Sequence, residues 1–153
     1  MDEILKELIT PFPDKYVEQK PGGKGGSYVK HGVVRQRLLD VLGFYEWSID
    51  REIFDANGKL TGCIGTLTVI LYGRPVKVQG SGDVEHDQGT NGANLKHAES
   101  DAFKRAAMNI GLGLHLWCGD EYFIYNKNVT DSKEGTAKPV NEKETIDQDS
   151  PGT

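Results

Sequence analysis

One stretch of the chain, residues 91–113, constrains the fold more than any other. Apolar and small side chains recur in it at the three- and four-residue spacing of a helix, at Leu95, Ala98, Ala102, Phe103, Ala106, Ala107 and Ile110. We expect an amphipathic helix from about Ala93 to Ile110, with Asn91 or Asn94 as its N-cap and Gly111 at its end. Because alanine side chains are small, this helix is expected to lie close against a sheet.

Another face of the same helix is basic. Lys96, His97, Ser100 and Lys104 lie one or two turns apart, and Arg105 is adjacent to Lys104. Such a face suits a surface that binds phosphates. On helix chemistry alone a solvated face is the more common explanation, since most charge runs simply face water.

The length and net charge of the chain limit the kinds of fold and of binding partner that it can have. The chain has 153 residues, enough for one core, and a formal net charge of −5. Residues 127–153 carry four lysines and six acidic residues, which leaves −3 for residues 1–126. A phosphate-bearing partner must therefore be held by a local basic groove rather than by bulk charge. With two cysteines, no signal peptide and no membrane-length apolar segment, we expect a protein of the reducing cytoplasm.

The rest of the chain divides into short elements. The pattern predicts a helix over 2–9, an extended segment to Lys20, a glycine-rich turn over 21–27 that carries Lys24, and a helix over 28–42 ended by Gly43. Strands are predicted over 44–54, 60–72 and 75–84, joined by an Asn57-Gly58 hairpin and a Gly73-Arg74 turn. Tyr45, Trp47, Ile49 and Ile53 are expected on one face of the first strand.

The last predicted segments frame the central helix. A polar loop is expected over 80–92, apolar segments at 114–117 and 122–125 are expected to pack on the core, and the tail over 126–153 is expected to be disordered. The predicted fold class is α+β, a helix, a three-stranded antiparallel meander and a helix within a domain of residues 1–125.

Catalytic and metal-binding patterns are weak. His115 and Cys118 could be combined with Cys63 or His97, and Asp83, Glu85 and Asp87 surround His86, but none has the usual spacing of a metal site. The aromatic residues Phe44, Tyr45, Phe54 and Tyr72 could stack on unpaired bases, whereas Trp47 is better explained by core packing.

Taken together, these stretches resemble the Rad fifty-two family of single-strand annealing proteins and its bacterial and phage relatives. The resemblance rests on residues 22–28, on Gly43-Phe44 with Trp47, on the Asn57-Gly58 hairpin, and on 99–106 followed by Asn109, Gly111 and Gly113. It covers roughly residues 20–125 in order. The most specific part is the run from Asp101 through Lys104, Arg105 and Ala106 to the glycine.

The resemblance implies a protein without a catalytic centre or cofactor. Family members form oligomeric rings that hold single-stranded DNA in an outer groove, backbone inward, and anneal complementary strands in recombination and repair. By matching position, Lys104 and Arg105 correspond to the family's inner phosphate-binding pair, and Lys96 to a further contact. Two family arginines are replaced here by Met108 and Val33, and Phe44 replaces a tyrosine.

The resulting interpretation is a homo-oligomeric protein of a bacterium or a phage-infected host that binds single-stranded DNA. A single-strand-binding protein or other recombination factor is a further candidate partner, through the tail. The DNA-binding candidates are Lys104, Arg105, Lys96, Lys30, Arg35, Arg37, Lys24, Arg74, Phe44 and Tyr45.

Two alternatives remain open from the residues alone. A double-stranded RNA-binding module shares the order of helix, three strands and helix, but grips phosphates mainly at the start of its second helix. Here the basic pair lies well inside the helix. A small metal-dependent enzyme using His86 or His115 is the other alternative.

Overall fold

A computed structural model describes residues 2–22 and 26–126. Its elements are α1 (Glu3–Ile9), the short 3-10 helix η1 (Asp14–Tyr16), β1 (Glu18–Gln19), β2 (Ser27–Tyr28), α2 (His31–Leu42), β3 (Glu46–Phe54), β4 (Leu60–Leu71), β5 (Arg74–Asp83), α3 (Asn91–Met108), α4 (Leu114–Cys118) and η2 (Gly119–Glu121). The predicted α+β order of helix, three-stranded meander and helix is confirmed by α2, β3–β5 and α3.

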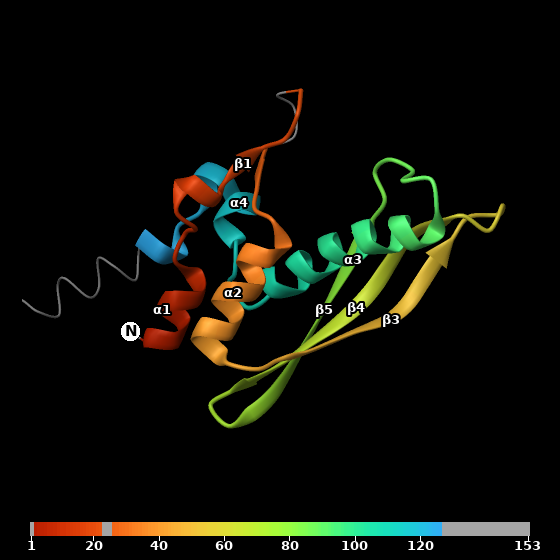
Figure 1. Ribbon diagram of the computed structural model, residues 1–153. Helices are drawn as coiled ribbons and strands as arrows, with labels where there is room; N and C mark the ends of the chain where they lie inside the picture. The colour runs from red at the N-terminus through yellow and green to blue at the C-terminus, as the bar shows by residue number, and fades with distance from the viewer. Residues whose placement is uncertain (1, 23–25, 127–153) are drawn as a thin grey trace, which may run out of the picture.

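The long helix α3 lies along one face of the antiparallel sheet β3-β4-β5, while α1, α2 and α4 gather at one end of it (Figure 1). β1 and β2 form a separate antiparallel pair. The sheet face away from α3 carries exposed side chains, among them Ile70 at 52% exposure. The sheet therefore has one buried and one open face.

Two glycines of β5 set how closely α3 approaches the sheet. A Cβ atom on Gly82 would lie 1.9 Å from the carbonyl oxygen of Ala98, and one on Gly80 would lie 2.0 Å from that of Ala102. The prediction of a close approach through the alanines of α3 is confirmed. The glycines of β5 are needed for it as well, because side chains there would collide with the helix backbone. The loop predicted over 80–92 was wrong at its start, because β5 continues to Asp83.

Phe103 of α3 is the centre of the main core. Its ring packs edge-on against Trp47 at 5.1 Å and against Tyr45 at 5.6 Å between centroids. The guanidinium of Arg35 lies 3.9 Å from the centroid of the same ring. This cluster joins α2, β3 and α3, and it confirms Trp47 as a core residue.

The first strand is less buried than its pattern predicted. After Trp47, every residue of β3 is exposed, and a bulge falls between Ile49 and Arg51. The extra residue, Asp50, reverses the alternation of the side chains. Ile53 consequently pairs with Gly62 on the face opposite to that of Ile49, which corrects the prediction that the two share a face.

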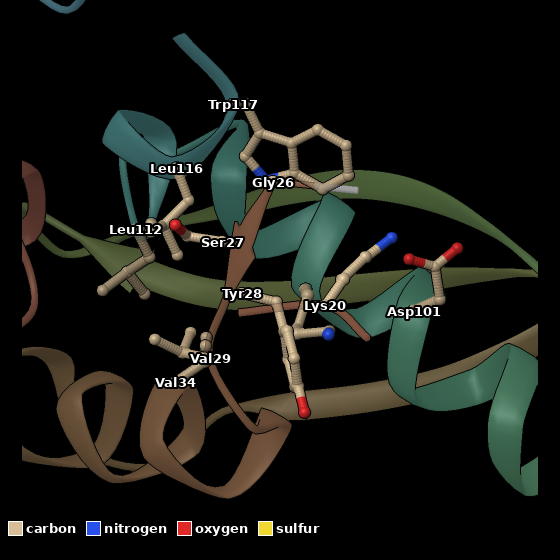
Figure 2. A pocket seen from close by; sticks show the side chains of 12 residues that line it. Lys20, Gly26, Ser27, Tyr28, Val29, Val34, Asp101, Leu112, Leu116 and Trp117 are labelled. Atoms are coloured by element: carbon tan, nitrogen blue, oxygen red, sulfur yellow. The ribbon is translucent and has the colours of Figure 1, made fainter. Parts of the chain in front are cut away.

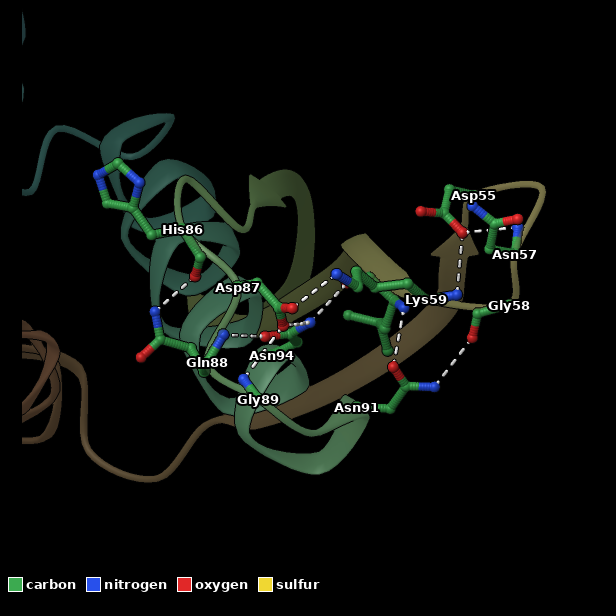
Figure 3. A network of polar contacts seen from close by, with 11 residues as sticks. Asp55, Asn57, Gly58, Lys59, His86, Asp87, Gln88, Gly89, Asn91 and Asn94 are labelled. Atoms are coloured by element: carbon green, nitrogen blue, oxygen red, sulfur yellow. Dashed lines mark hydrogen bonds and ion pairs between the residues drawn. The ribbon is translucent and has the colours of Figure 1, made fainter.

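A polar network fixes the start of α3 to the β3–β4 hairpin (Figure 3). The N-cap is Thr90, whose hydroxyl accepts from the amide of Ala93, so the predicted caps Asn91 and Asn94 were wrong. Their side chains bond the hairpin instead. Asn91 accepts from the amide of Leu60 at 3.0 Å, and buried Asn94 donates to the carbonyl of Leu60 at 3.1 Å.

Asp87 connects this network to Lys59 through an ion pair of 2.6 Å. Hydrogen bonds from Lys59, the amide of Gly89 and Asn94 lower the pKa of Asp87 from 3.8 to about 2. A carboxyl with a lowered folded-state pKa stabilises the fold above its unfolded pKa, and this contribution is lost as the pH falls towards the folded pKa.

We therefore expect Asp87→Asn to lower the thermal midpoint at pH 6, and the difference from the wild type to shrink as the pH falls from about 4 to about 2. Circular dichroism melts across that range measure it. A difference that does not change with pH would contradict the assignment.

Other boundaries also differ from prediction. α2 begins at His31 rather than Tyr28, which lies in β2, and the segment before Lys20 contains η1. The second tight turn is Tyr72-Gly73, both with positive φ, so Arg74 opens β5. The tail predicted over 126–153 lies outside the described residues except for Asn126. Among the described helices, none combines the length and apolar character needed to cross a membrane.

Candidate nucleic-acid interface

An open groove of about 740 Å³ lies between α3, the chain around β1 and β2, and the end of α4. The residues that line it are Lys20, Pro21, Tyr28, Asp83, Glu85, His86, His97, Ser100, Asp101, Lys104, Arg105 and Trp117. It brings together the most specific motif of the sequence and three cations from two separate parts of the chain.

Lys104 is half-buried at the inner side of the groove, with its ammonium nitrogen 5.5 Å from the centroid of the Tyr28 ring. Burial lowers its pKa, and the neighbouring cations Lys20 and Arg105 lower it further, while Asp101 and Glu85 act in the opposite direction. A bound anion would stabilise the charged form of this amine. Lys104 is thus a partly desolvated cation, whose charged form an anion in the groove would stabilise.

Arg105 is held by an aromatic ring and a carboxylate. Its guanidinium lies 4.7 Å from the centroid of the Trp117 ring, and its Nε donates to Asp101 at 3.2 Å. The same carboxylate oxygen of Asp101 accepts from the amide of Asp83 at 3.2 Å. The stacking on Trp117 and the pairing with Asp101 orient the guanidinium group, while the Arg105 side chain remains 42% exposed.

The opposite rim is mixed in charge. Lys20 pairs with Glu85 at 3.4 Å, with both side chains largely exposed. His97 lies 3.3 Å from the carbonyl oxygen of Asp83 through its Nδ1 atom. Exposed pairs of this kind are weak, so they leave Lys20 able to exchange its carboxylate partner for a phosphate.

The structure places the other described candidates outside the groove. Lys96 is exposed two turns before Lys104 on the same helical face, in line with the groove. Lys30 precedes α2 and pairs with Glu18 at 3.2 Å. Arg74 is exposed at the start of β5. Lys24 lies outside the described residues.

Arg35 and Tyr45 pack against Phe103 of the core instead of lining the groove. Arg35 pairs with Glu99 at 2.7 Å and donates to the hydroxyl of Tyr45 at 3.2 Å while stacking on Phe103. These contacts tie α2 to α3. The structure therefore gives both residues a packing role, and their proposed contacts with DNA stay a prediction.

Arg37 and Phe44 lie on another side of the molecule. Arg37 donates to the carbonyl of Thr10 and stacks on Phe12 at 4.1 Å, and burial lowers its pKa. With Val33 it lines a separate surface hollow between α2 and the segment around η1. Phe44 is 94% exposed just before β3. An aromatic ring so exposed is available for a base or for another protein chain.

Among the groove residues that were not DNA-binding candidates from the sequence are one cation and two aromatic residues. Lys20 and Tyr28 flank the glycine-rich turn, and Trp117 lies in the segment after α3. Aromatic rings beside a basic pair are typical of a nucleic-acid groove. Tyr28 and Trp117 are too far along the chain from each other for the sequence to show that both lie beside Lys104 and Arg105.

The described residues do not bring together the ligands that the metal-site alternatives would need. Within residues 2–22 and 26–126, no group of three or more histidine, cysteine, aspartate and glutamate side chains is arranged to hold a metal ion. His86 is exposed, and His115 packs between the rings of Phe12 and Tyr122, each at 5.9 Å.

Comparisons with known proteins match the chain to one family model and to two curated relatives. Residues 1–136 match the family model described as Rad52/22 family double-strand break repair protein. The chain is 31% identical over 123 residues to DNA repair RAD52-like protein 1, mitochondrial, of Arabidopsis thaliana, covering 77% of this chain and 68% of that protein. It is 32% identical over 125 residues to single-stranded DNA-binding protein DdrA of Deinococcus deserti, covering 76% of this chain and 58% of that protein, or less than two thirds of its length.

Proposed function

The chain belongs to the Rad52/22 family of double-strand break repair proteins, and we propose that it binds single-stranded DNA in the groove beside α3 and anneals complementary strands in recombination and repair. Family membership confirms the resemblance drawn from the sequence. A relative whose name states single-stranded DNA binding supports the proposed ligand.

The observation that carries the proposal is the pairing of Lys104 and Arg105 in one open groove of an otherwise acidic chain. Both are oriented by aromatic rings, Tyr28 and Trp117. Contacts with phosphates hold a strand without reading its sequence. That is the requirement for annealing, because any sequence must be held with its bases free to pair.

Self-association into a ring is part of the proposal. β3 and β5 are the outer strands of the order β3-β4-β5, so each has an edge that pairs with no strand of the described chain. Such edges join readily to strands of another subunit. A repeated groove multiplies weak contacts through avidity, which offsets the small number of cations in each subunit.

The test uses the purified full chain. Fluorescence anisotropy with a labelled single-stranded oligonucleotide, with duplex RNA as competitor, measures binding, and energy transfer between two labelled complementary strands measures annealing. We expect binding that weakens with salt, accelerated annealing, and a mass of several subunits by light scattering. Preferential binding of duplex RNA, or no binding of single-stranded DNA at low salt, would overturn the proposal.

Asp101 provides a variant that should bind more tightly. Its carboxylate occupies Arg105 and adds negative charge to the groove. Because an exposed ion pair is worth up to about 1 kcal/mol, Asp101→Asn is expected to raise the affinity for single-stranded DNA by up to about fivefold. The matched control is Asp40→Asn, which removes an exposed carboxylate of α2 away from the groove. Weaker binding by Asp101→Asn in folded protein would show that Arg105 needs this partner to reach the strand.

A further inference from the structure

The described residues that line the groove carry balanced charges. Three are cations and three are carboxylates: Lys20, Lys104 and Arg105, and Asp83, Glu85 and Asp101. Figure 2 shows the inner side of the groove, to which the segment after β1, α3 and α4 contribute Lys20, Asp101 and Trp117. The groove is also lined by His86 and His97. A proton on either histidine therefore gives these lining residues a net positive charge.

His97 is held in a defined orientation by the end of β5. It is exposed on α3, two turns before Lys104 and on the same side of the helix. Its Nδ1 atom lies 3.3 Å from the carbonyl oxygen of Asp83. Because a carbonyl oxygen can only accept a hydrogen bond, this contact requires Nδ1 to carry a proton. A further proton then goes to Nε2, and the imidazolium that forms keeps its bond to Asp83.

His86 lies on the loop between β5 and α3, and this loop is anchored to α3. The backbone carbonyl of His86 accepts from Nε2 of Gln88 at 2.6 Å, and the amide of Gln88 donates to the buried Asn94 at 2.7 Å. The imidazole of His86 points away from this network (Figure 3) and is exposed in the groove. Both histidines are thus presented to a ligand from anchored backbone.

The described charged and titratable groups that face the two imidazoles come from every element around the groove. They are Asp101, Lys104 and Arg105 of α3, Asp83 at the end of β5, Glu85 of the following loop, and Lys20 and Tyr28 of the segment from β1 to β2. The carboxylates favour a protonated imidazole, and the cations oppose it. A phosphate in the groove adds negative charge at the same place, so it shifts this balance towards protonation.

We propose that His97 and His86 contact phosphates of the bound strand as imidazolium groups, so that binding of the strand takes up protons. The proposal rests on the proposed binding of single-stranded DNA. By linkage, protons raise the affinity for the strand by the factor by which the strand raises the affinity for protons. Since histidine changes its charge between pH 5 and 8, the chain holds single strands more tightly at pH 6 than at pH 8. The added contacts are with phosphates, so the bases stay free to pair.

The first experiment measures the affinity for a thymidine oligonucleotide at pH 8 and at pH 6, at constant ionic strength. Thymine and the phosphodiester backbone keep their charges over this range, so a difference reports the protein. Because an exposed ion pair changes an affinity by up to about fivefold, two histidines should make binding about tenfold tighter at pH 6. His86→Gln with His97→Gln should bind almost equally at both pH values. Lys104, whose pKa burial lowers, is the same in both proteins, so their difference isolates the histidines.

The matched control is His31→Gln, the same substitution at an exposed histidine of α2 outside the groove. It should keep the tenfold response of the wild type. His97→Lys, which carries a charge at both pH values, should bind up to about fivefold more tightly than the wild type at pH 8 and respond less to pH. A folded His86→Gln, His97→Gln protein that keeps the full response to pH would overturn the proposal.

Calorimetry on the wild type gives a second answer that needs no variant. The heat of binding at pH 6.5, measured in two buffers with different heats of ionisation, should differ, because protons are taken up together with the strand. Equal heats would overturn the proposal and leave the proposed function intact. Absence of binding at both pH 6 and pH 8 would overturn the proposed function itself. Should the double variant fail to fold, the calorimetry decides alone.

Discussion

Replacing Lys104 and Arg105 together by alanine is expected to lower the affinity for single-stranded DNA roughly thirtyfold and to slow annealing in proportion. Both cations line the groove, and neither carries the core. Losing two contacts with charged phosphates costs about 2 kcal/mol, since an exposed ion pair is worth up to about 1 kcal/mol, and about 2 kcal/mol corresponds to a thirtyfold change in affinity. Anisotropy titrations and the energy-transfer annealing assay measure both effects.

The matched control removes the same charge from the other side of the sheet. Arg51 and Lys77 are exposed, and they alternate with residues that face α3, so they lie on the open face. Arg51→Ala with Lys77→Ala should reduce affinity far less, through bulk charge alone. Equal losses in the two double variants would mean that net charge, and not this groove, holds the strand.

The largest effect on stability is expected at Gly82. A Cβ atom there would overlap the Ala98 carbonyl oxygen at 1.9 Å and lie 2.5 Å from the amide nitrogen of Ala102. Both are backbone atoms, so the helix itself must move away from β5. Overpacking of this kind costs up to about 3 kcal/mol, and Gly82→Ala is expected to lower the free energy of unfolding by that amount.

Urea denaturation followed by circular dichroism measures the loss, and Gly32→Ala is the matched control. Gly32 lies in α2, where an added Cβ atom meets nothing within 4 Å. Because alanine is a better helix former than glycine, this control should stabilise the chain by up to about 1 kcal/mol. A Gly82→Ala protein as stable as the wild type would show that α3 does not lie directly on the strand.

The pattern of the sequence predicted the elements whose cause is local. The alanine stripe of α3, the Asn57-Gly58 hairpin and the helix end at Gly43 follow from side-chain size, turn chemistry and a positive φ, and all three are present. The bulge at Asp50 and the N-cap at Thr90 depend on how the strands and the hairpin meet. Nothing local in the sequence distinguishes a bulged strand from a regular one, or a cap at Thr90 from a cap at Asn91 or Asn94.

For the candidate site, sequence reasoning found Lys104 and Arg105 but neither their contacts nor the third cation of the groove, Lys20. Helical spacing correctly placed Lys104 on an accessible face beside Arg105. It could not show that Arg35 pairs with Glu99, 64 residues away, in a contact that ties α2 to α3. It equally could not bring Lys20 and Trp117 to the same groove. Charges can be counted from the sequence, but their partners are set by tertiary contacts.

The most direct measurement of the central claim is the salt dependence of single-stranded DNA binding, compared between the wild type and the Lys104→Ala, Arg105→Ala variant. Each phosphate contact with a single strand contributes a slope of roughly 0.7 in a plot of log affinity against log salt concentration. If both cations contact phosphates, the variant's slope will be shallower by about 1.4. Parallel lines for the two proteins would contradict the account, because the strand would then be held elsewhere.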